Sequence, residues 1–398
     1  MTKTTCCIAG GGPAGMMLGF MLARAGIDVT VLEKHPDFFR DFRGDTIHPS
    51  TMEILHELNL LEKFLTLPHN KIEKISAQIG EHTLQIADIS HLKVHAPFIA
   101  IIPQWDFLNF IASEAKQYPN FHLLMHTEAT DFIDDDKKII GVHAKNNAES
   151  IDIYADLVVA ADGRHSILRE KSGLPKKDFG APMDVMWFRV SRNKTDEQSF
   201  GKIDMGKMLV MIDRVDYWQC AYLIRKGDFD HIRAAGIDAF HRDLLELVPM
   251  LANRLQEIKS WDQIKLLTVT IDRLTKWYLP GFLCIGDAAH AMSPMGGVGI
   301  NLAIQDAVAA ANYLIPAFKK NNLTEKTLLQ IQQRRMLPTK IMQSFQVMMQ
   351  NRVIDRVLGN PVHPKIALPL KLLNRFPILR RIPARLVGMG FRPEHVRN

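Results

Sequence analysis

Residues 281–314 read GFLCIGDAAHAMSPMGGVGINLAIQDAVAAANYL, and they predict a strand, a glycine-rich turn and a helix in that order. The apolar run FLCI predicts a short buried strand that ends at Gly286 and Asp287. Small and apolar residues then recur at helical spacing from Ile300 onward. Because a helix N-terminus presents unpaired N–H groups and partial positive charge, this stretch predicts an anion-binding site. The alternative is a turn that only lets the helix pack closely on a sheet.

Another glycine-rich turn, the first along the chain, lies near the N-terminus. The apolar run CCIA is followed by GGGPAG at 10–15, then by a predicted helix and by the strand DVTVL, which ends at Glu33. In a dinucleotide site, Gly10 makes the tight turn, Gly12 lets the backbone approach a pyrophosphate, and Gly15 lets helix and strand pack closely. Glu33 has the position of the acid that binds a ribose hydroxyl.

Two further segments belong with these motifs. The run IDIYADLVVAA at 151–161 predicts a long apolar strand, and Asp162 and Gly163 follow it directly. Arg43 lies in a charged connection between the second strand and a predicted helix start after His48. We therefore expect Arg43 close to a nucleotide bound at the first glycine turn, although a single arginine in a loop is more often solvated.

The length and composition predict a globular protein of two domains. The chain has 398 residues, of which 47% are hydrophobic and 23% charged, as in ordinary soluble proteins. Its four cysteines form no CxxC pair, which indicates a reducing compartment. No apolar run approaches the roughly 20 residues of a transmembrane helix, and the N-terminus lacks the apolar core of a signal peptide. We therefore expect a cytoplasmic location.

Strand-like runs outside the glycine motifs predict a second domain. The runs KISAQI, HTLQIADI, VMWFRVS, MLVMID and YWQCAYLIR are typical of a separate β-sheet. We expect an α/β protein in which this sheet domain is inserted into a Rossmann-like domain and a helical segment follows. The expected boundaries are 1–72, 98–180 and 273–325 for the Rossmann-like domain, 73–97 and 181–272 for the sheet domain, and 326–398 for the C-terminal helical segment.

The net charge of +6 is concentrated at the C-terminus. Residues 361–398 contain two Lys and six Arg against one acid, Glu394, so the rest of the chain is close to neutral. The run KLLNRFPILRRIPARLVGMGF mixes these charges with apolar residues. This pattern predicts either contact with a membrane surface or an amphipathic helix docked on the protein body. Nucleic-acid binding is not expected.

The motifs GGGPAG, ADGR and IGDAAH occur in this order along the chain, and their combination resembles the para-hydroxybenzoate hydroxylase-like FAD-dependent monooxygenases, which are single-component aromatic hydroxylases. The resemblance implies an extended FAD whose ADP half lies on the first glycine turn, and NAD(P)H as a transient co-substrate. The residues assigned to cofactor binding by the motifs and the resemblance are Gly10, Gly12, Pro13, Ala14, Gly15, Glu33, Lys34, Arg43, Gln104, Asp162, Gly163, Gly286, Asp287, Pro294, Gly297, Val298, Gly299, Ile300 and Asn301.

The resemblance also places Pro294, Gly296 and Gly297 beside the isoalloxazine ring, where a helix N-terminus would stabilise anionic reduced flavin. No catalytic side chain is assigned firmly, because the cofactor carries the chemistry. His48 is a candidate neighbour of the flavin. The sequence shows no catalytic triad, no close pair of carboxylates and no metal-binding cluster.

The implied reaction is hydroxylation of an aromatic or other electron-rich apolar small molecule. NAD(P)H would reduce FAD, O2 would form a flavin hydroperoxide, and its distal oxygen would pass to the substrate. The tryptophan-rich motif of flavoprotein halogenases is absent, so halogenation is not expected. Arg189, Met211, Tyr222 and Met295 are the candidate substrate contacts, although large apolar residues in a sheet more often form core.

Two other classes of function remain open. One is a flavin-dependent reductase or dehydrogenase that acts on a lipophilic substrate at a membrane surface, which the basic C-terminal segment would suit. The other is a flavoprotein that mainly binds its ligand. A monomer and a homodimer are both compatible with the sequence.

Overall fold

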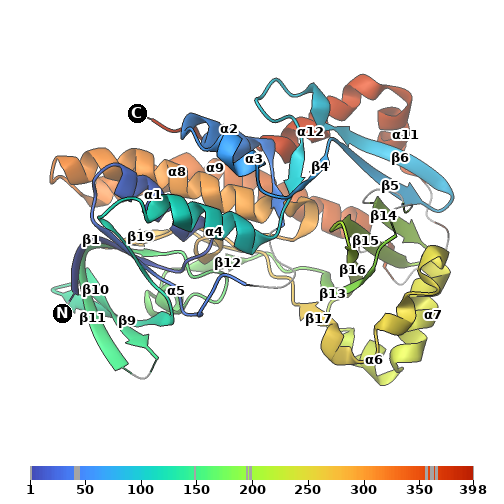
Figure 1. Cartoon of the computed structure of the whole chain (residues 1–398), viewed down its shortest axis with the longest axis horizontal. Helices are drawn as coiled ribbons and strands as arrows, with labels where there is room; N and C mark the ends of the chain where they lie inside the picture. Colours follow the sequence, from blue (N-terminus) through green and yellow to red (C-terminus); the bar gives the residue numbers. More distant parts are fainter. Residues whose placement is uncertain are drawn as a thin grey trace.

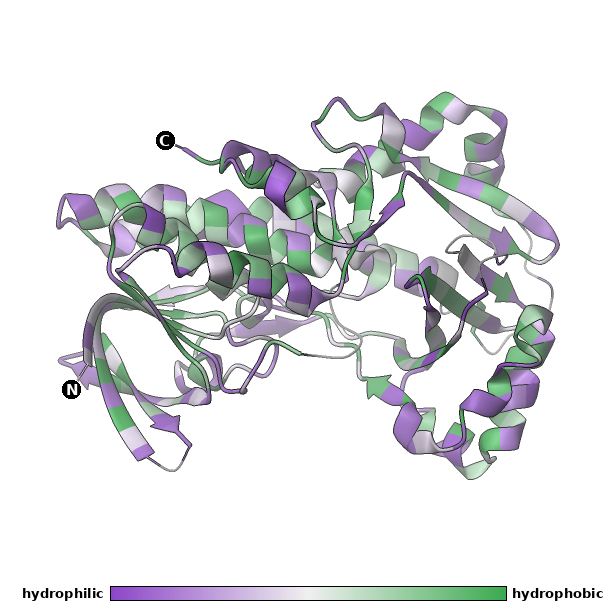
Figure 2. Ribbon diagram, viewed as in Figure 1, coloured by the Kyte–Doolittle hydropathy of each residue, from purple (hydrophilic) through white to green (hydrophobic). Residues whose placement is uncertain are grey.

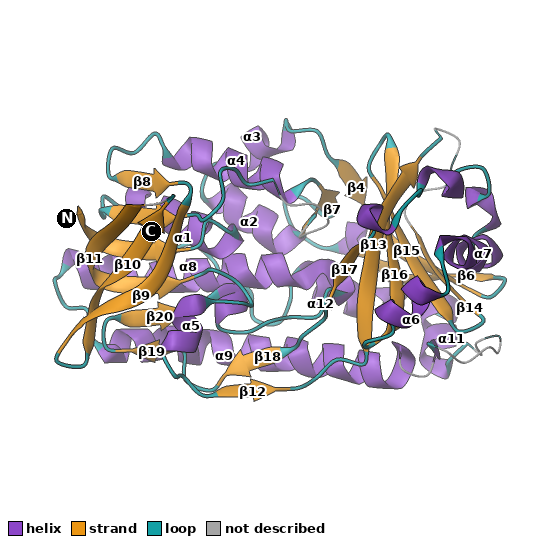
Figure 3. Ribbon diagram, turned by 90° about the horizontal axis from the view of Figure 1, so that it is seen from below, coloured by secondary structure: helices purple, strands orange, loops and turns teal. Residues whose placement is uncertain are grey.

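The computed structural model describes residues 2–39, 45–147, 149–193, 196, 200–354, 357–358, 363 and 366–397 (Figure 1). Two β-sheets lie at opposite ends of the molecule, and the long helices α8 and α9 run between them (Figure 3). This mixed α/β architecture confirms the predicted fold class.

The first sheet is the Rossmann-like one. Its strand order is β19-β20-β11-β1-β2-β8, and neighbouring strands from β20 to β8 are parallel, whereas the β9–β10 hairpin extends antiparallel from β11. The central strands are apolar and buried on both faces, as a covered parallel sheet requires. The strands are β1 (Thr2–Ala9), β2 (Val29–Leu32), β8 (Phe121–Leu124), β9 (Thr127–Asp135), β10 (Lys138–Asn146), β11 (Glu149–Ala160), β19 (Tyr278–Leu279) and β20 (Phe282–Cys284).

Three helices pack together against this sheet, and a fourth packs on one of the three. They are α1 (Pro13–Arg24), α4 (Gln104–Ala115) and α8 (Val298–Lys319), with α9 (Glu325–Met349) packed on α8 (Figure 1). Alanines line α8 at 307 and 309–311, and all of them are fully buried, which permits close helix packing. The segment Met295–Lys319 is long and apolar enough to cross a membrane, but 83% of its most apolar window is buried inside the protein.

The second sheet has the strand order β17-β13-β16-β15-β14-β5-β6. Segments far apart in the chain meet in it, because β5 pairs in parallel with β14. Helices α6 (Phe229–Ala234) and α7 (Ile237–Leu247) lie at this end of the molecule, and α7 packs on one face of the sheet. The strands are β5 (Lys74–Ile79), β6 (His82–Asp88), β13 (Met183–Ser191), β14 (Phe200–Asp204), β15 (Lys207–Asp213), β16 (Tyr217–Arg225) and β17 (Lys265–Leu267).

Short elements connect the two sheets and finish the chain. A three-stranded sheet joins β3, β7 and β4, a ribbon pairs β12 with β18, and the C-terminal helices α11 and α12 lie beside β6 (Figure 1). These elements are β3 (Thr46–Ile47), α2 (Pro49–Glu57), α3 (Leu61–Leu65), β4 (Asn70–Ile72), β7 (Ile99–Ile101), α5 (Ile167–Lys171), β12 (Lys176–Asp178), β18 (Asp272–Leu274), a π-helical turn (Gln350–Ile354), α11 (Leu368–Arg375) and α12 (Arg381–Gly388).

Candidate active site

The first glycine turn has the geometry of a pyrophosphate site. Gly10 has a φ of 109°, and a Cβ at Gly15 would overlap the carbonyl oxygen of Gly10, so both positions require glycine. At Gly12 the nearest atom to an added Cβ is the Ala161 carbonyl oxygen at 3.9 Å, which leaves open space beside the backbone. Helix α1 begins there without a side-chain cap and without an acid in its first turn. Its N–H groups and positive dipole end are therefore available to an anion.

Residues that follow the second strand support this turn. Glu33 is buried, and its carboxylate accepts hydrogen bonds from the backbone N–H groups of Gly11 and His35, each at 3.1 Å. The carboxylate therefore lies against the glycine turn, as a ribose-binding acid does. Lys34 forms a surface ion pair with Glu128 at 3.5 Å. Arg43, the other basic candidate, lies outside the described residues.

The three predicted motifs meet at one edge of the first sheet, because β1, β11 and β20 are neighbouring parallel strands. Gly10, after β1, packs on the backbone of Ala161 after β11. Arg164, also after β11, lies with its Nη2 at 3.5 Å from Asp287 Oδ2 after β20. Ligands of open parallel sheets bind beyond such carboxyl ends.

Asp162 and Arg164 each carry a buried polar atom that has no hydrogen-bond partner among the described residues. Asp162 Oδ2 accepts the Ile167 N–H at 3.2 Å, whereas its Oδ1 has no hydrogen-bond partner in the described part of the chain. Burial raises the pKa of the Asp162 carboxyl. Arg164 Nη1 is likewise buried without a partner there. Unpaired buried donors and acceptors are costly, so their presence at the meeting point of the strand ends fits a bound polar group. Gly163 has a φ of 88°, which favours glycine.

The second glycine turn leads from Pro294 into α8. Gly296 and Gly297 have φ values of 77° and 63°, and a Cβ at Gly297 would overlap Thr46 Oγ1. Helix α8 has no side-chain cap and no acid in its first turn, which contains Val298, Gly299 and Ile300. This helix N-terminus also offers free N–H groups and positive dipole charge.

Asn301 holds this turn in place. Its Oδ1 accepts the His48 N–H at 2.9 Å and the Thr51 hydroxyl at 2.7 Å, and its Nδ2 donates to the carbonyl oxygens of Thr46 at 3.0 Å and Gly297 at 3.2 Å. The side chain of Asn301 is thereby fully engaged within the protein. The side chain thus positions the turn, and the cofactor-binding role of Asn301 stays a prediction.

His48 is fully buried and is held by the C-terminal helix. Its Nδ1 lies 2.8 Å from the Val387 carbonyl oxygen of α12, so Nδ1 carries the donated hydrogen. Burial lowers the pKa of His48 to about 4. The imidazole is therefore neutral at physiological pH, and its Nε2 has no hydrogen-bond partner among the described residues.

Gly286 is fixed by a buried ion cluster that sequence reasoning missed. Asp306 of α8 accepts the Gly286 N–H at 3.1 Å and lies 2.6 Å from His290 Nε2 and 2.8 Å from Arg335 Nε. Arg335 also contacts Glu394 at 3.2 Å. Burial alone would raise the pKa of Asp306, but His290 and Arg335 hold that pKa below its usual value. The signal in the sequence is a single acid inside the apolar run of α8.

Gln104 begins α4, and its backbone N–H lies 3.4 Å from Asp45 Oδ1. Asp45 is itself buried, pairs with Arg214, and accepts the Gln219 amide at 2.8 Å. Burial raises the pKa of Asp45 although Arg214 and Gln219 oppose the shift. Asp45 thus links the first sheet's α4 to the second sheet, a role that the sequence did not indicate.

The two faces of the second sheet separate the candidate substrate residues. Met211 and Tyr222 are buried in the core with α7, where the Tyr222 and Phe240 ring centroids lie 5.6 Å apart. The structure thus places these two candidate substrate contacts on the face that α7 covers. Met295 of the glycine turn packs on the other face, and Arg189, which is exposed, shares that face by the alternation of β13.

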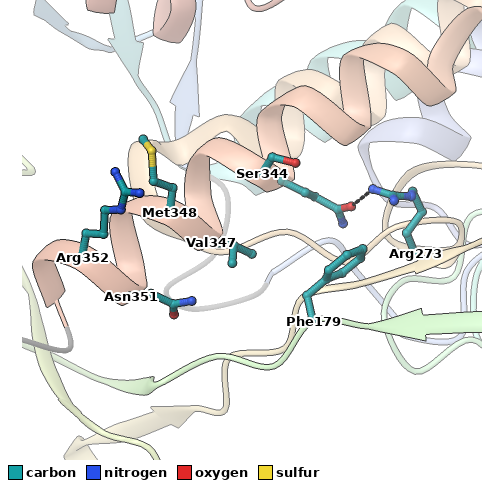
Figure 4. A pocket seen from close by; sticks show the side chains of 8 residues that line it. Phe179, Arg273, Ser344, Val347, Met348, Asn351 and Arg352 are labelled. Carbon is teal, nitrogen blue, oxygen red and sulfur yellow. Dashed lines mark hydrogen bonds between the residues drawn. The ribbon is translucent and has the colours of Figure 1, made fainter.

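A separate pocket of about 330 Å³ lies between α9 and the β12–β18 region. Figure 4 shows Arg273 directed toward α9, where its Nη1 donates to Gln343 Oε1 at 2.6 Å. The pocket is lined by Phe179, Arg273, Gln343, Ser344, Val347, Met348, Asn351 and Arg352. These are not the residues of the strand ends, so this pocket is distinct from the site described above.

The comparisons with known proteins agree with this geometry. Residues 3–343 match the family described as FAD binding domain. The chain belongs to this family. It is 28% identical over 386 residues to a 6-methylpretetramide 4-monooxygenase from Streptomyces rimosus, a match that covers 96% of the chain and 92% of the relative. A para-nitrophenol 4-monooxygenase from a Pseudomonas species is 24% identical, with 81% and 80% covered.

Solved structures share the fold. The p-nitrophenol 4-monooxygenase PnpA from Pseudomonas putida DLL-E4 superposes with a TM-score of 0.79 at 18% identity, which covers 98% of this chain and all of that one. The protein is thus an FAD-dependent monooxygenase of the para-hydroxybenzoate hydroxylase-like type. Some relatives have a different chemistry, since a pyrrole-carbonyl chlorinase from Pseudomonas fluorescens is 24% identical over 80% of the chain.

The residues of this flavoprotein fit FAD. The open space at Gly12 faces an uncapped helix N-terminus, Glu33 lies against the turn, and Asp162 and Arg164 offer an unpaired acceptor and donor. Asp287 adds a carboxylate that is 30% exposed at the adjacent strand end. The helix N-terminus thus offers positive charge to phosphates, and the carboxylates offer acceptors to sugar hydroxyls.

Proposed function

We propose that this protein is a single-component hydroxylase that inserts one oxygen atom into an aromatic or other electron-rich apolar small molecule. The overall reaction takes substrate R–H, O2, NAD(P)H and a proton to R–OH, NAD(P)⁺ and water. Relatives named for 4-monooxygenation of 6-methylpretetramide and of para-nitrophenol support an aromatic substrate. The predicted cytoplasmic location remains part of this proposal.

One observation carries the proposal. An apolar face of the second sheet, formed by Val185, Trp187, Val210 and Leu267, packs toward Met295 of the second glycine turn. The turn at which the family binds its flavin ring therefore adjoins a surface suited to an apolar ring. The other face of the same sheet is closed by α7, which leaves the Met295 side for substrate.

When bound, FAD would supply the redox chemistry that links NAD(P)H to O2. The chain supplies binding and electrostatics. The N-termini of α1 and α8 stabilise negative charge, Glu33 and Asp287 hold hydroxyl groups, and Asn301 fixes the backbone of the second turn. Neutral His48 keeps this region free of an added positive charge and excludes water by its burial.

The test is NAD(P)H consumption by the purified, FAD-loaded protein with a panel of phenols, indoles and polycyclic aromatic compounds. Peroxide is measured in parallel. We expect at least one compound to accelerate consumption with little peroxide and to yield a product that gains one oxygen atom. Acceleration with stoichiometric peroxide, or none with any compound, would contradict oxygen insertion.

The same assay separates the other candidate functions. A reductase would consume NAD(P)H with a lipophilic acceptor in the absence of O2, whereas a ligand-binding flavoprotein would bind compounds without accelerated turnover. Because relatives include a chlorinase, the panel is repeated with bromide and chloride present. We expect no halogenated product, in line with the absent tryptophan-rich motif.

A further inference from the structure

The outer surface of residues 366–392, which contains α11 and α12 and is here called the tail surface, collects exposed apolar side chains. Thirteen large hydrophobic residues in the described chain are exposed, and six of them lie here, each 42 to 68% exposed. Figure 1 shows these helices at one corner of the molecule beside β6, and Figure 2 shows hydrophobic and hydrophilic residues interleaved along them. The six are Leu368, Leu372, Phe376, Ile378, Ile382 and Phe391.

These exposed side chains do not take part in packing the tail surface helices on the protein body. Other residues already make that contact, since Ile366 and Leu370 pack on the cluster of Ile79, Leu84 and Ile203. In α12, Ala384 is fully buried against β6, β7 and the turn between them. The two helices therefore have a satisfied inner face and a second apolar stripe that faces outward.

In α11 the outward stripe has helical spacing. Leu368 and Leu372 are four residues apart, Phe376 continues the row, and Lys371 and Arg375 adjoin it at a spacing of three. All five side chains are exposed. Apolar residues flanked by long basic side chains are the composition of helices that lie in a lipid interface.

The same arrangement recurs ten residues later. Ile378 and Ile382 are four residues apart, and Arg381 and Arg385 adjoin them at a spacing of three. Two consecutive helical segments therefore each expose an apolar pair flanked by basic side chains, which is more than scattered single exposed residues.

Arg380 fixes the two segments relative to each other. Its guanidinium donates to the carbonyl oxygens of Leu373 at 3.0 Å and Asn374 at 3.1 Å, at the C-terminus of α11. It also donates to Gln85 of β6. Because one side chain caps α11 and ties it to the body, the outward stripe is presented on a preorganised scaffold.

The tail surface is strongly positive. Residues 366–392 contain six Lys or Arg and no acid. The next acid along the chain, Glu394, is only 3% exposed and pairs with Arg334 at 2.6 Å. From the body, Glu81 at the β5–β6 turn lines the same hollow as Lys371 and Arg375. One acid does not balance this charge.

We propose that the tail surface docks on an anionic lipid bilayer. Five exposed basic groups, those of the tail surface other than Arg380, complement the phosphate headgroups, while the aliphatic and aromatic stripe enters the interface. A second copy of the chain would bring two surfaces of like charge together, and a nucleic acid would gain little from the exposed leucines and isoleucines. Docking does not depend on the reaction proposed above, because none of the exposed apolar and basic residues named here belongs to the flavin site.

The test is co-sedimentation of the full-length, FAD-loaded protein with vesicles of phosphatidylglycerol and phosphatidylcholine in equal parts. We expect partitioning at least about tenfold stronger than to pure phosphatidylcholine, and a similar loss when high salt screens the charges. The same protein remaining in the supernatant with both vesicles would overturn the proposal.

Two pairs of matched variants sharpen the test. The triple variant Leu368→Ser, Ile378→Ser, Ile382→Ser should bind at least about tenfold more weakly, whereas Val215→Ser, Leu245→Ser, Leu337→Ser should bind like the parent. The variant Lys371→Gln, Arg375→Gln, Arg381→Gln should also bind weakly. Its control, Lys137→Gln, Lys138→Gln, Lys145→Gln, has the same net charge but changes exposed lysines of the β9–β10 hairpin.

FAD content and the unfolding midpoint check that every variant is folded. Equal losses in the tail variants and their controls would show a dependence on overall charge or hydropathy and contradict docking. A parent dimer that the serine variant converts to a monomer would assign the surface to a second copy. RNA that binds parent and serine variant equally and displaces the vesicles would assign it to nucleic acid.

Discussion

The two glycine turns of this protein lead into similar helix N-termini but are held in place by different contacts. Both precede a helix with no side-chain cap and no acid in its first turn. The turn before α1 is shaped by its own backbone, since Gly15 closes on Gly10 and Gly12 faces open space. The turn before α8 is held by distant residues, with Asn301 bonded to Thr46 and His48. Local backbone geometry thus shapes one predicted anion site, whereas tertiary contacts shape the other.

This difference predicts that damage will have different consequences at the two turns. Substitutions at the first turn should remove cofactor and leave the fold intact wherever the added atoms enter open space. Substitutions of the buried polar residues of α8 should destabilise the protein itself, because they break buried side-chain networks.

The largest effect is expected for Asp306→Ala. Removing this carboxylate leaves Arg335 buried without its closest counter-charge and the Gly286 N–H without its acceptor. Breaking a buried pair by removing one partner costs about 3–5 kcal/mol. Urea unfolding of the apoprotein measures the loss. The control is Asp131→Ala, which removes an ion pair whose two side chains are each 49% exposed and should change stability little. Equal effects would show that the buried cluster does not stabilise the fold around Gly286.

The second effect is a pH dependence that His48 brings to folding. Its folded pKa of about 4 lies below the ordinary value of 6.5, so the unfolded chain binds more protons between these values. Stability should therefore be fully present above about pH 6.5 and decrease by on the order of 3 kcal/mol as pH falls toward 4. His48→Asn keeps a donor for the Val387 carbonyl and removes the titration. Parallel stability profiles of parent and variant across this window would contradict the buried, neutral imidazole.

At the first turn, Gly12→Val should reduce FAD affinity by about ten- to hundredfold, as expected when methyl groups are forced against a bound pyrophosphate. The apoprotein should unfold as the parent does, because an added Cβ has no protein atom closer than 3.9 Å. The ratio of flavin to protein absorbance measures retention. Gly201→Val in β14, where the nearest atom to a Cβ is 3.8 Å away, is the matched control and should stay yellow. A yellow Gly12→Val protein would remove this turn from the FAD site.

The smallest effect is expected for Asp287→Ala. Loss of one charged acceptor beside Arg164 should weaken FAD binding about tenfold without unfolding the protein. Titration of apoprotein with FAD, followed by flavin fluorescence, measures the change, and Asp287→Asn should lie between variant and parent. Unchanged affinity in Asp287→Ala would exclude this carboxylate from the site.

The same contrast explains what could be predicted from the sequence. The turn at Gly10 to Gly15 and the acid Glu33 were predictable, because their roles depend on backbone geometry and on spacing of a few residues. The strand ends at Asp162 and Asp287 were predictable as ligand positions, and the strand order of the sheet brings them together.

Other parts could not be predicted, because they depend on long-range contacts. Asp306 meets Arg335 across 29 positions of sequence, Arg335 meets Glu394 across 59, and no local pattern encodes these pairings. Alternation along a strand tells which residues share a face and does not tell which face α7 covers, so the sequence could not separate Met211 and Tyr222 from Met295.

The proposed function is oxygen insertion at an FAD site that adjoins an apolar sheet face. Its most direct test uses 18O-labelled dioxygen with the compound that most accelerates NAD(P)H consumption, followed by mass spectrometry of the product. We expect one labelled oxygen atom per product molecule, NAD(P)H consumption in step with product, and loss of both in Gly12→Val. A product without label, or consumption that yields only peroxide, would contradict it.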